Sequence, residues 1–217
     1  MEKLELEYLV QEPNEINNNT QLIILLHGYG SNEEDLFSFA KELPENLIVI
    51  SARAPLTLGF GGFAWYSINF TESEGKFSDT KEAIEAREKI ATFITQIQNK
   101  YSIKPKKTFL LGFSQGTILS YSIALNYPEK IQKVIALSGY INPDLLPEDV
   151  KSKDYSKLDF YISHGSVDQV IPVDWANKAP KFLEALHVKH SYQEFPVGHG
   201  VAPQNFYALK QWIEERM

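Results

Sequence analysis

Short apolar runs that alternate with helical patterns constrain this chain more than any other feature. Each run holds three to five consecutive aliphatic or aromatic residues, which is typical of a strand buried on both faces. Strands that alternate with helices favour a parallel sheet covered by helices on both sides. The predicted buried strands are Leu22–Leu26, Leu47–Ile50, Phe109–Leu111, Val134–Leu137 and Phe160–Ile162, followed by a strand-like Tyr192–Phe195.

Helical spacing is clearest from about Thr80 to Tyr101, where apolar residues recur on one face. Another helix follows Ser114 and must end before Pro128, and a last one opens at Pro203 as a first-turn proline. Pro180 interrupts a pattern that otherwise runs from 173 to 187, so we expect a break or a restart there. The segment 4–10 alternates with period two and predicts an edge strand. The sequence therefore predicts one α/β domain over residues 1–217, without a large lid.

Composition excludes several classes of protein. The 217 residues include no cysteine, so disulfides, thiolate nucleophiles and cysteine-ligated metals are impossible. A net charge of −7 argues against nucleic acid and anionic membranes as partners. The start of the chain alternates charged and apolar residues, and no apolar run approaches the length of a membrane span. We expect a cytoplasmic protein with no metal, no organic cofactor and no stable membrane insertion.

One motif indicates chemistry: Gly112-Phe-Ser114-Gln-Gly116. It follows a predicted strand and precedes a predicted helix, as a nucleophile elbow requires. The serine of such an elbow sits on a sharp, strained turn, and glycines two residues away on either side let the strand and helix approach closely. Ser114 is therefore the candidate nucleophile, against the alternative of a serine in an ordinary tight turn.

A serine hydroxyl needs a base to remove its proton. His199 is the candidate, because it lies between two glycines in a loop before the final helix. His27 and His164 end strands and are interpreted as hydrogen-bonded structural residues. His187 and His190 are three residues apart, but no carboxylate joins them, so we expect them to be exposed rather than metal ligands.

The base in turn needs an acid. Asp168 follows a buried strand in a loop closed by Pro172, whereas Asp174 fits the start of a helix better. The order serine, aspartate, histidine is the order of α/β-hydrolases. Oxyanion donors are expected from the amide of Gln115 and from the loop 27–31.

Two glycine-rich stretches compete as phosphate loops. The first, at 28–30, lacks the third glycine of a dinucleotide fingerprint and is followed by Glu33-Glu34-Asp35, which would repel a phosphate. The second, Gly59-Phe-Gly-Gly-Phe63, is not followed by Lys-Ser/Thr and is interpreted as a mobile loop.

These blocks together resemble the phospholipase/carboxylesterase family, which includes acyl-protein thioesterases and bacterial carboxylesterases. The resemblance spans about Leu22 to Trp212, with the blocks in the family's order. It implies an α/β-hydrolase fold, cofactor-free ester hydrolysis, nucleophile Ser114, acid Asp168 and base His199, with oxyanion donors at the Tyr29 and Gln115 amides. The blocks are Leu25-Leu-His-Gly-Tyr-Gly, Ala64-Trp-Tyr, Gly112-Phe-Ser-Gln-Gly, Ser138-Gly139, His164-Gly-Ser-Val-Asp-Gln-Val-Ile-Pro and Gly198-His-Gly.

Two departures from the family pattern concern specificity. The chain has Trp65-Tyr66-Ser67 where the family often has Trp-Phe-Asp, and 31–35 is closer to the bacterial esterases, so protein depalmitoylation is in doubt. The connections 52–79 and 139–158 are expected to line the entrance. Candidates for an apolar acyl wall, with ordinary packing as the alternative, are Phe60, Phe63, Trp65 and Tyr66.

The expected substrate is a small ester with a short or medium acyl chain, bound in a site open to solvent; thioesters and lysophospholipids are further candidates. An amide-cleaving serine peptidase and a non-catalytic binding protein are the alternatives. A dienelactone hydrolase is disfavoured, because its usual cysteine nucleophile is absent. The sequence does not indicate an oligomeric state.

Overall fold

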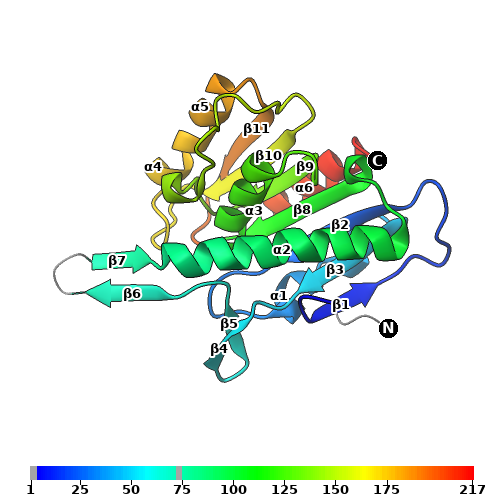
Figure 1. Cartoon of the computed structure of the whole chain (residues 1–217), viewed down its shortest axis with the longest axis horizontal. Helices are drawn as coiled ribbons and strands as arrows, with labels where there is room; N and C mark the ends of the chain where they lie inside the picture. Colours follow the sequence, from blue (N-terminus) through cyan, green and yellow to red (C-terminus); the bar gives the residue numbers. More distant parts are fainter. Residues whose placement is uncertain (1–3, 72–74) are drawn as a thin grey trace.

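The computed structural model of this chain describes residues 4–71 and 75–217 and contains a seven-stranded, mostly parallel sheet (Figure 1). The strand order is β1-β3-β2-β8-β9-β10-β11, and only the edge strand β1 runs antiparallel to its neighbour. The predicted α/β-hydrolase class is confirmed. The strands are β1 Tyr8–Gln11, β2 Gln21–Leu26, β3 Leu47–Ala52, β8 Thr108–Phe113, β9 Lys133–Leu137, β10 Asp159–Gly165 and β11 Lys189–Phe195.

Helices cover both faces of the sheet, which explains the unbroken apolar runs of the strands. In β2, Leu22, Ile24 and Leu26 join one core, while Ile23 and Leu25 join the other. The first core packs beneath α2, α3 and α5, and the second beneath α1 and α6 (Figure 1). The helices are α1 Glu33–Phe37, α2 Thr80–Tyr101, α3 Gln115–Asn126, α4 Val173–Ala176, α5 Lys178–Ala185 and α6 Pro203–Glu214.

The element boundaries follow the local signals closely. α2 spans the predicted residues, α3 ends at Asn126 before Pro128, and α6 begins at Pro203. The break near Pro180 falls at Asn177, so that the proline lies in the first turn of α5, where its missing N–H costs no hydrogen bond. The edge strand was predicted at 4–10, but the segment that pairs with the sheet is β1, Tyr8–Gln11. Leu6 lies before this strand and is buried without joining the sheet.

The connection between β3 and α2 differs from the expected loop. It contains two antiparallel hairpins, β4 Leu56–Gly59 with β5 Gly62–Ala64, and β6 Ile68–Thr71 with β7 Gly75–Ser78. The stretch Gly59–Phe63 is therefore a hairpin turn and the strand after it, and the loop interpretation was wrong. Gly59, Phe60 and Gly61 all have positive φ, a conformation that only the glycines adopt without strain. Residues 72–74 of this connection, like residues 1–3, lie outside the described part of the chain.

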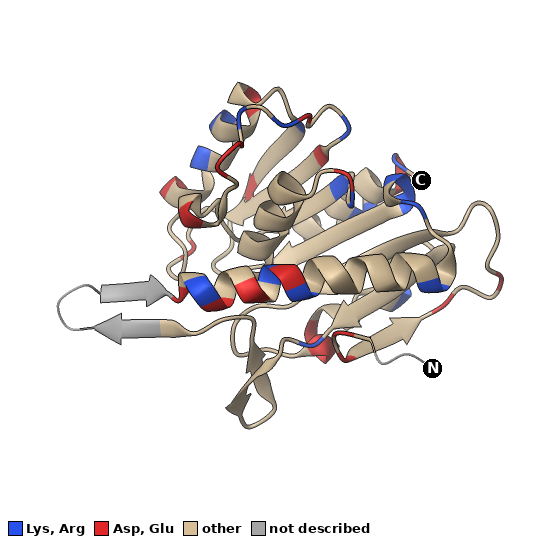
Figure 2. Ribbon diagram, viewed as in Figure 1, with Lys and Arg blue, Asp and Glu red and all other residues tan. Residues whose placement is uncertain are grey.

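The sheet register brings the predicted site residues to one edge. Leu26 pairs with Gly112, Phe113 with Leu137, and Gly165 with Phe195, so the carboxyl ends of these parallel strands lie together. Open α/β sheets build their sites at this edge. Charged side chains lie mainly on helices and loops, while the central strands are nearly free of them (Figure 2). Among the described residues, none of the helices is both long enough and apolar enough to span a bilayer.

Candidate active site

Ser114 occupies a strained turn between β8 and α3. Its backbone angles, φ 53° and ψ −115°, lie outside the regions that residues with side chains normally adopt. The flanking glycines explain how the turn forms. A Cβ on Gly112 would lie 2.5 Å from backbone atoms of Gly116, and a Cβ on Gly116 would lie 2.1 Å from the Leu26 carbonyl oxygen. The geometry is that of a nucleophile elbow.

His199 links Ser114 to Asp168 across three separate loops. Its Nε2 lies 2.9 Å from Ser114 Oγ, and its Nδ1 lies 2.7 Å from Asp168 Oδ2. The carboxylate can only accept, so Nδ1 carries a proton and Nε2 is left to accept the serine hydroxyl proton. The ring also packs against Phe113, with the ring centroids 5.0 Å apart. The structure thus brings together the three residues that the sequence predicted.

Asp168 is a buried carboxylate with a full set of partners. Its Oδ1 accepts hydrogen bonds from the amides of Val170, at 2.8 Å, and Ile171, at 2.9 Å. Burial acts to raise its pKa, but the His199 hydrogen bond and the two amides outweigh burial, and the pKa falls below its ordinary value of 3.8. The group therefore stays ionised beside His199. The alternative acid, Asp174, lies exposed in the first turn of α4.

The two predicted oxyanion donors lie on the elements expected for them. Gln115 opens α3 directly after Ser114, and Tyr29 lies in the loop that follows β2. Neither amide donates to another group in the part of the chain that the structure describes. Both Tyr29 and Gln115 line the same cavity as Ser114 and His199. Their amides are available as donors to a bound substrate.

His27 and Trp65 brace the loop that carries Tyr29. His27 Nδ1 lies 2.8 Å from the Gly28 carbonyl oxygen and therefore donates, while Nε2 accepts from the Ala54 amide at 3.1 Å. Trp65 Nε1 donates to the His27 carbonyl oxygen at 2.9 Å. The Gln115 side chain extends this bracing, because its Oε1 accepts from the Trp65 amide at 2.9 Å. His27 is thus a hydrogen-bonded residue beneath the oxyanion loop.

The buried ring of His27 predicts a loss of stability in acid. Burial lowers its pKa below the ordinary value of 6.5, although its bond to the Gly28 carbonyl opposes the shift. The unfolded chain then binds this proton more readily, so the stabilisation is complete above pH 6.5 and decreases as the pH falls below it. We expect His27 to contribute a loss of unfolding free energy between pH 7 and 5.5. Urea titrations of the wild type and His27→Gln at both pH values measure it; equal losses in the two proteins would contradict it.

A cavity of about 430 Å³ opens beside Ser114 and His199. Of the four predicted acyl-wall residues, only Tyr66 lines it. Phe60 is fully exposed at the tip of the β4–β5 hairpin, and Phe63 packs against Arg53 on another surface. Trp65 is buried under the oxyanion loop. The acyl-wall prediction was thus wrong for three residues, because the β4–β5 hairpin carries Phe60 and Phe63 away from the cavity and Trp65 packs beneath the oxyanion loop.

Most of the other residues that line the cavity were not identified from the sequence. Tyr140 and Trp175 form an edge-to-face pair, with ring centroids 5.1 Å apart, at the side of the cavity. Tyr140 belongs to the connection 139–158 that was expected near the entrance, but Trp175 follows the acid loop and carried no sequence signal. Beyond Ser114, His199, Tyr29, Tyr66 and Gln115, the lining residues are Ile68, Thr80, Ile118, Tyr140, Asn142, Asp144, Val170, Ile171 and Trp175.

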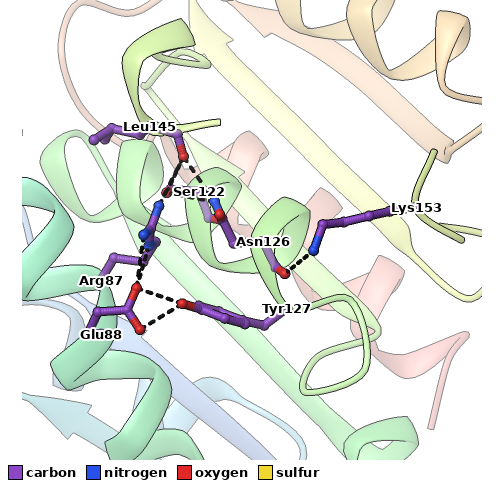
Figure 3. A network of polar contacts seen from close by, with 7 residues as sticks. All are labelled: Arg87, Glu88, Ser122, Asn126, Tyr127, Leu145 and Lys153. Atoms are coloured by element: carbon purple, nitrogen blue, oxygen red, sulfur yellow. Dashed lines mark hydrogen bonds and ion pairs between the residues drawn. The ribbon is translucent and has the colours of Figure 1, made fainter. Parts of the chain in front are cut away.

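The turn that contains Asp144 is held in place through the carbonyl group of the adjacent Leu145 (Figure 3). The carbonyl oxygen of Leu145 accepts hydrogen bonds from Ser122 Oγ and Asn126 Nδ2, each at 2.9 Å, both on α3. Arg87 of α2 donates to the same oxygen at 3.3 Å. This wall of the cavity is therefore anchored to α2 and α3.

The other polar clusters give no ligand geometry. His187 is exposed at the end of α5, while His190 is half-buried on β11 and bonds the Val188 carbonyl oxygen at 2.9 Å. Across residues 4–71 and 75–217, no three histidine, aspartate or glutamate side chains gather as a group that could hold a metal ion. At the first glycine-rich loop, Glu33 begins α1 and pairs with Arg53.

A serine on a strained strand-to-helix turn, joined through a histidine to a buried aspartate at the carboxyl edge of a parallel sheet, defines the serine-hydrolase class of the α/β-hydrolase fold. The Phospholipase/Carboxylesterase family profile matches residues 9–217. The chain belongs to that family, as the sequence motifs predicted. It is a serine hydrolase of the carboxylesterase and acyl-thioesterase type.

Curated relatives carry two kinds of name. Acyl-protein thioesterase 1 of Saccharomyces cerevisiae is 28% identical over 215 residues, covering 91% of this chain and 93% of that protein. A probable carboxylesterase of Oryza sativa subsp. japonica is 24% identical over 210 residues, covering 92% and 79%. The names of these relatives thus cover both carboxylesterases and acyl-protein thioesterases.

Solved structures show the same fold at low sequence identity. Esterase PE8 superposes with a TM-score of 0.86 at 23% identity, covering 99% of this chain and 100% of that chain. The Bacillus cereus carboxylesterase gives a TM-score of 0.82 at 16% identity, covering 98% and 95%. The match over whole chains supports a single α/β-hydrolase domain.

Proposed function

We propose that this protein is a serine carboxylesterase that hydrolyses small esters through Ser114, His199 and Asp168. Ser114 Oγ attacks the acyl carbonyl while His199 Nε2 takes its proton. The amides of Tyr29 and Gln115 stabilise the oxyanion. His199 then gives the proton to the leaving alcohol, and the acyl group remains on Ser114. Water, deprotonated by His199, releases the acid and restores the serine.

The continuous hydrogen-bonded chain from Asp168 through His199 to Ser114 carries this proposal. A fluorophosphonate probe tests it, because such probes react quickly only with an activated serine. We expect the probe to label the wild type but not Ser114→Ala. It should also label the control variant Ser152→Ala, because Ser152 is exposed and does not line the cavity. Absence of labelling in the wild type would favour the binding-protein alternative. Cleavage of peptide anilides at rates similar to esters would favour the peptidase alternative.

The cavity supports short or medium acyl chains as substrates. Its wall is largely aromatic and aliphatic, and its volume of about 430 Å³ is within the range of small-ligand pockets. We expect hydrolysis of p-nitrophenyl esters to be fastest for chains of intermediate or short length. A steady rise in kcat/KM from two to sixteen carbons would contradict this substrate class. Thioesters of the same acyl groups belong in the same screen, since relatives are named acyl-protein thioesterases.

The charge of the wall predicts a preference against anionic acyl groups. Asp144 lines the cavity, and no lysine or arginine is among its described lining residues. We expect p-nitrophenyl butyrate to be hydrolysed roughly tenfold faster than the p-nitrophenyl monoester of succinate, because a like charge a few Å away costs about 1 kcal/mol or more. Asp144→Asn should narrow this ratio, and Asp149→Asn, outside the cavity, should not. An unchanged ratio in Asp144→Asn would contradict the assignment.

We also propose a cytoplasmic location and a small ester as the partner. The acidic net charge argues against nucleic acid and anionic membranes as partners, and the cavity of about 430 Å³ beside Ser114 suits a small ester.

A further inference from the structure

His164 is a buried histidine that the proposed reaction does not use. It lies near the end of β10, four residues before Asp168, and is 1% exposed. The sequence grouped it with His27 as a structural residue at a strand end. Its position in the fold is different, because its ring lies directly behind the acid of the triad.

The Nε2 atom of His164 has two neighbours that belong to the acid loop. It lies 2.9 Å from the Ile171 carbonyl oxygen and 3.3 Å from Asp168 Oδ2. Both neighbours are acceptors, so Nε2 carries a proton and points it toward them. Asp168 Oδ2, the oxygen that accepts from His199, therefore lies between two histidines.

The contacts of His164 complete the set of groups that orient the carboxylate. Asp168 Oδ1 is held by the amides of Val170 and Ile171, and His164 binds the carbonyl of that same Ile171. The ring thereby fixes the turn that supplies the amides and also lies against the other carboxylate oxygen. Rotation of the carboxylate away from His199 would break contacts on both oxygens.

The backbone around this ring ties the acid loop to the base loop. The amides of Ser166 and Val167 donate to the carbonyl oxygens of Phe195, at 2.8 Å, and Val197, at 3.3 Å. A Cβ on Gly165 would lie 2.2 Å from the Gly198 carbonyl oxygen, so the end of β10 touches the loop that carries His199. With the two backbones fixed, the alignment of Asp168 with His199 depends on the orientation of their side chains, and His164 contacts the carboxylate oxygen that faces His199.

The second ring nitrogen argues against a purely structural role. Nδ1 of His164 is buried and has no hydrogen-bond partner among the described residues. A buried polar atom without a partner costs about 1–3 kcal/mol, a cost that an apolar side chain of similar size would avoid. The site therefore holds a histidine at a cost in stability, which is consistent with a function for its other nitrogen.

We propose that His164 is a positioning residue of the catalytic triad, which holds the Asp168 carboxylate with Oδ2 facing His199 Nδ1. The proposal rests on the proposed roles of Ser114, His199 and Asp168. It assigns to His164 no contact with substrate. Misorientation of the acid would leave His199 poorly oriented for proton transfer, so the effect falls on kcat rather than on substrate binding.

Two amide variants, His164→Gln and His164→Asn, test whether a hydrogen-bond donor is needed at the place of His164 Nε2. Gln at 164 has a side-chain nitrogen that reaches the place of Nε2, whereas the nitrogen of Asn reaches only the place of Nδ1. We expect His164→Asn and His164→Leu to lower kcat by about 10²-fold with KM within twofold, and His164→Gln to recover most of it. His190→Leu, which loses only a bond to a backbone carbonyl, serves as the control. Rates are normalised to active sites titrated with a fluorophosphonate, so a fraction of unfolded enzyme does not lower kcat.

A spectroscopic measurement reports on the same contact without turnover. The His199 Nδ1–H proton, bonded to Asp168 at 2.7 Å, should give a far-downfield proton NMR resonance in the wild type and His164→Gln and lose it in His164→Asn. Equal kcat in the Gln and Asn variants, or a resonance retained in both, would overturn the proposal even if His164→Leu fails to fold. Failure of the proposed function is a distinct result: the wild type would show no esterase activity, and the resonance would still test His164.

Discussion

Ser114→Ala should lower kcat for ester hydrolysis by roughly 10⁵- to 10⁶-fold and leave the protein folded. The hydroxyl supplies the nucleophile, and its loss removes the acyl-enzyme route completely; removal of the serine from comparable triads costs about 10⁶-fold. A small residual rate over water is expected, because the amides of Tyr29 and Gln115 still polarise a bound ester. The measurement is kcat on p-nitrophenyl butyrate with thermal unfolding of the same sample.

Two further variants, His199→Ala and Ser152→Ala, test whether the loss of rate is specific to the proposed catalytic residues. Loss of the base should cost nearly as much as loss of the nucleophile, because the two act as a unit and their effects are not additive. The double variant Ser114→Ala/His199→Ala should therefore be no slower than either single variant by more than a few fold. Ser152→Ala should match the wild type. Substantial activity in Ser114→Ala would assign the reaction to another group.

Gly116→Ala should prevent the native fold from forming or lower its stability by at least about 3 kcal/mol. The added Cβ would lie 2.1 Å from the carbonyl oxygen of Leu26 and 2.9 Å from that of His27. Both contacts are backbone atoms at the end of β2, so neither can move aside without opening the sheet next to β8. Because α3 begins one residue earlier, the change also displaces the turn that presents Ser114.

Gly198→Ala is the matched control for stability. A Cβ there meets no atom within 4 Å, and its φ is not in the left-handed region. We expect its unfolding free energy to be within about 0.5 kcal/mol of the wild type, as for most substitutions away from packed positions. Urea unfolding of both variants measures the difference. Similar stability of Gly116→Ala and the wild type would show that β2 and α3 are not in the close contact described.

Several features were predictable because their causes are local. Runs such as Leu22–Leu26 indicate a strand buried on both faces, and the helix at 80–101 follows from its apolar spacing. The elbow at Ser114 was predictable for the same reason, since its glycines and serine lie within five residues. Asp168 and His199 were predicted by their positions after strands, and the parallel sheet brings such positions to one edge.

The acyl wall was not predictable in this way. Phe60 and Phe63 were expected near the substrate because they are aromatic and follow a central strand. Their side-chain directions depend on the β4–β5 hairpin, whose register places Phe60 at the tip and turns Phe63 toward Arg53. Trp175 was missed because nothing within its own helix indicates that Tyr140 packs beside it.

The sequence by itself determined the order of strands and helices, the elbow and the three residues of the proposed triad, because each depends on nearest neighbours and on the shared edge of a parallel sheet. Only the tertiary structure decided which side chains form the cavity and which group orients Asp168. These depend on contacts between residues far apart in the chain or on side-chain directions after folding. His164 illustrates the difference: the sequence places it at a strand end, and folding places its Nε2 against the acid.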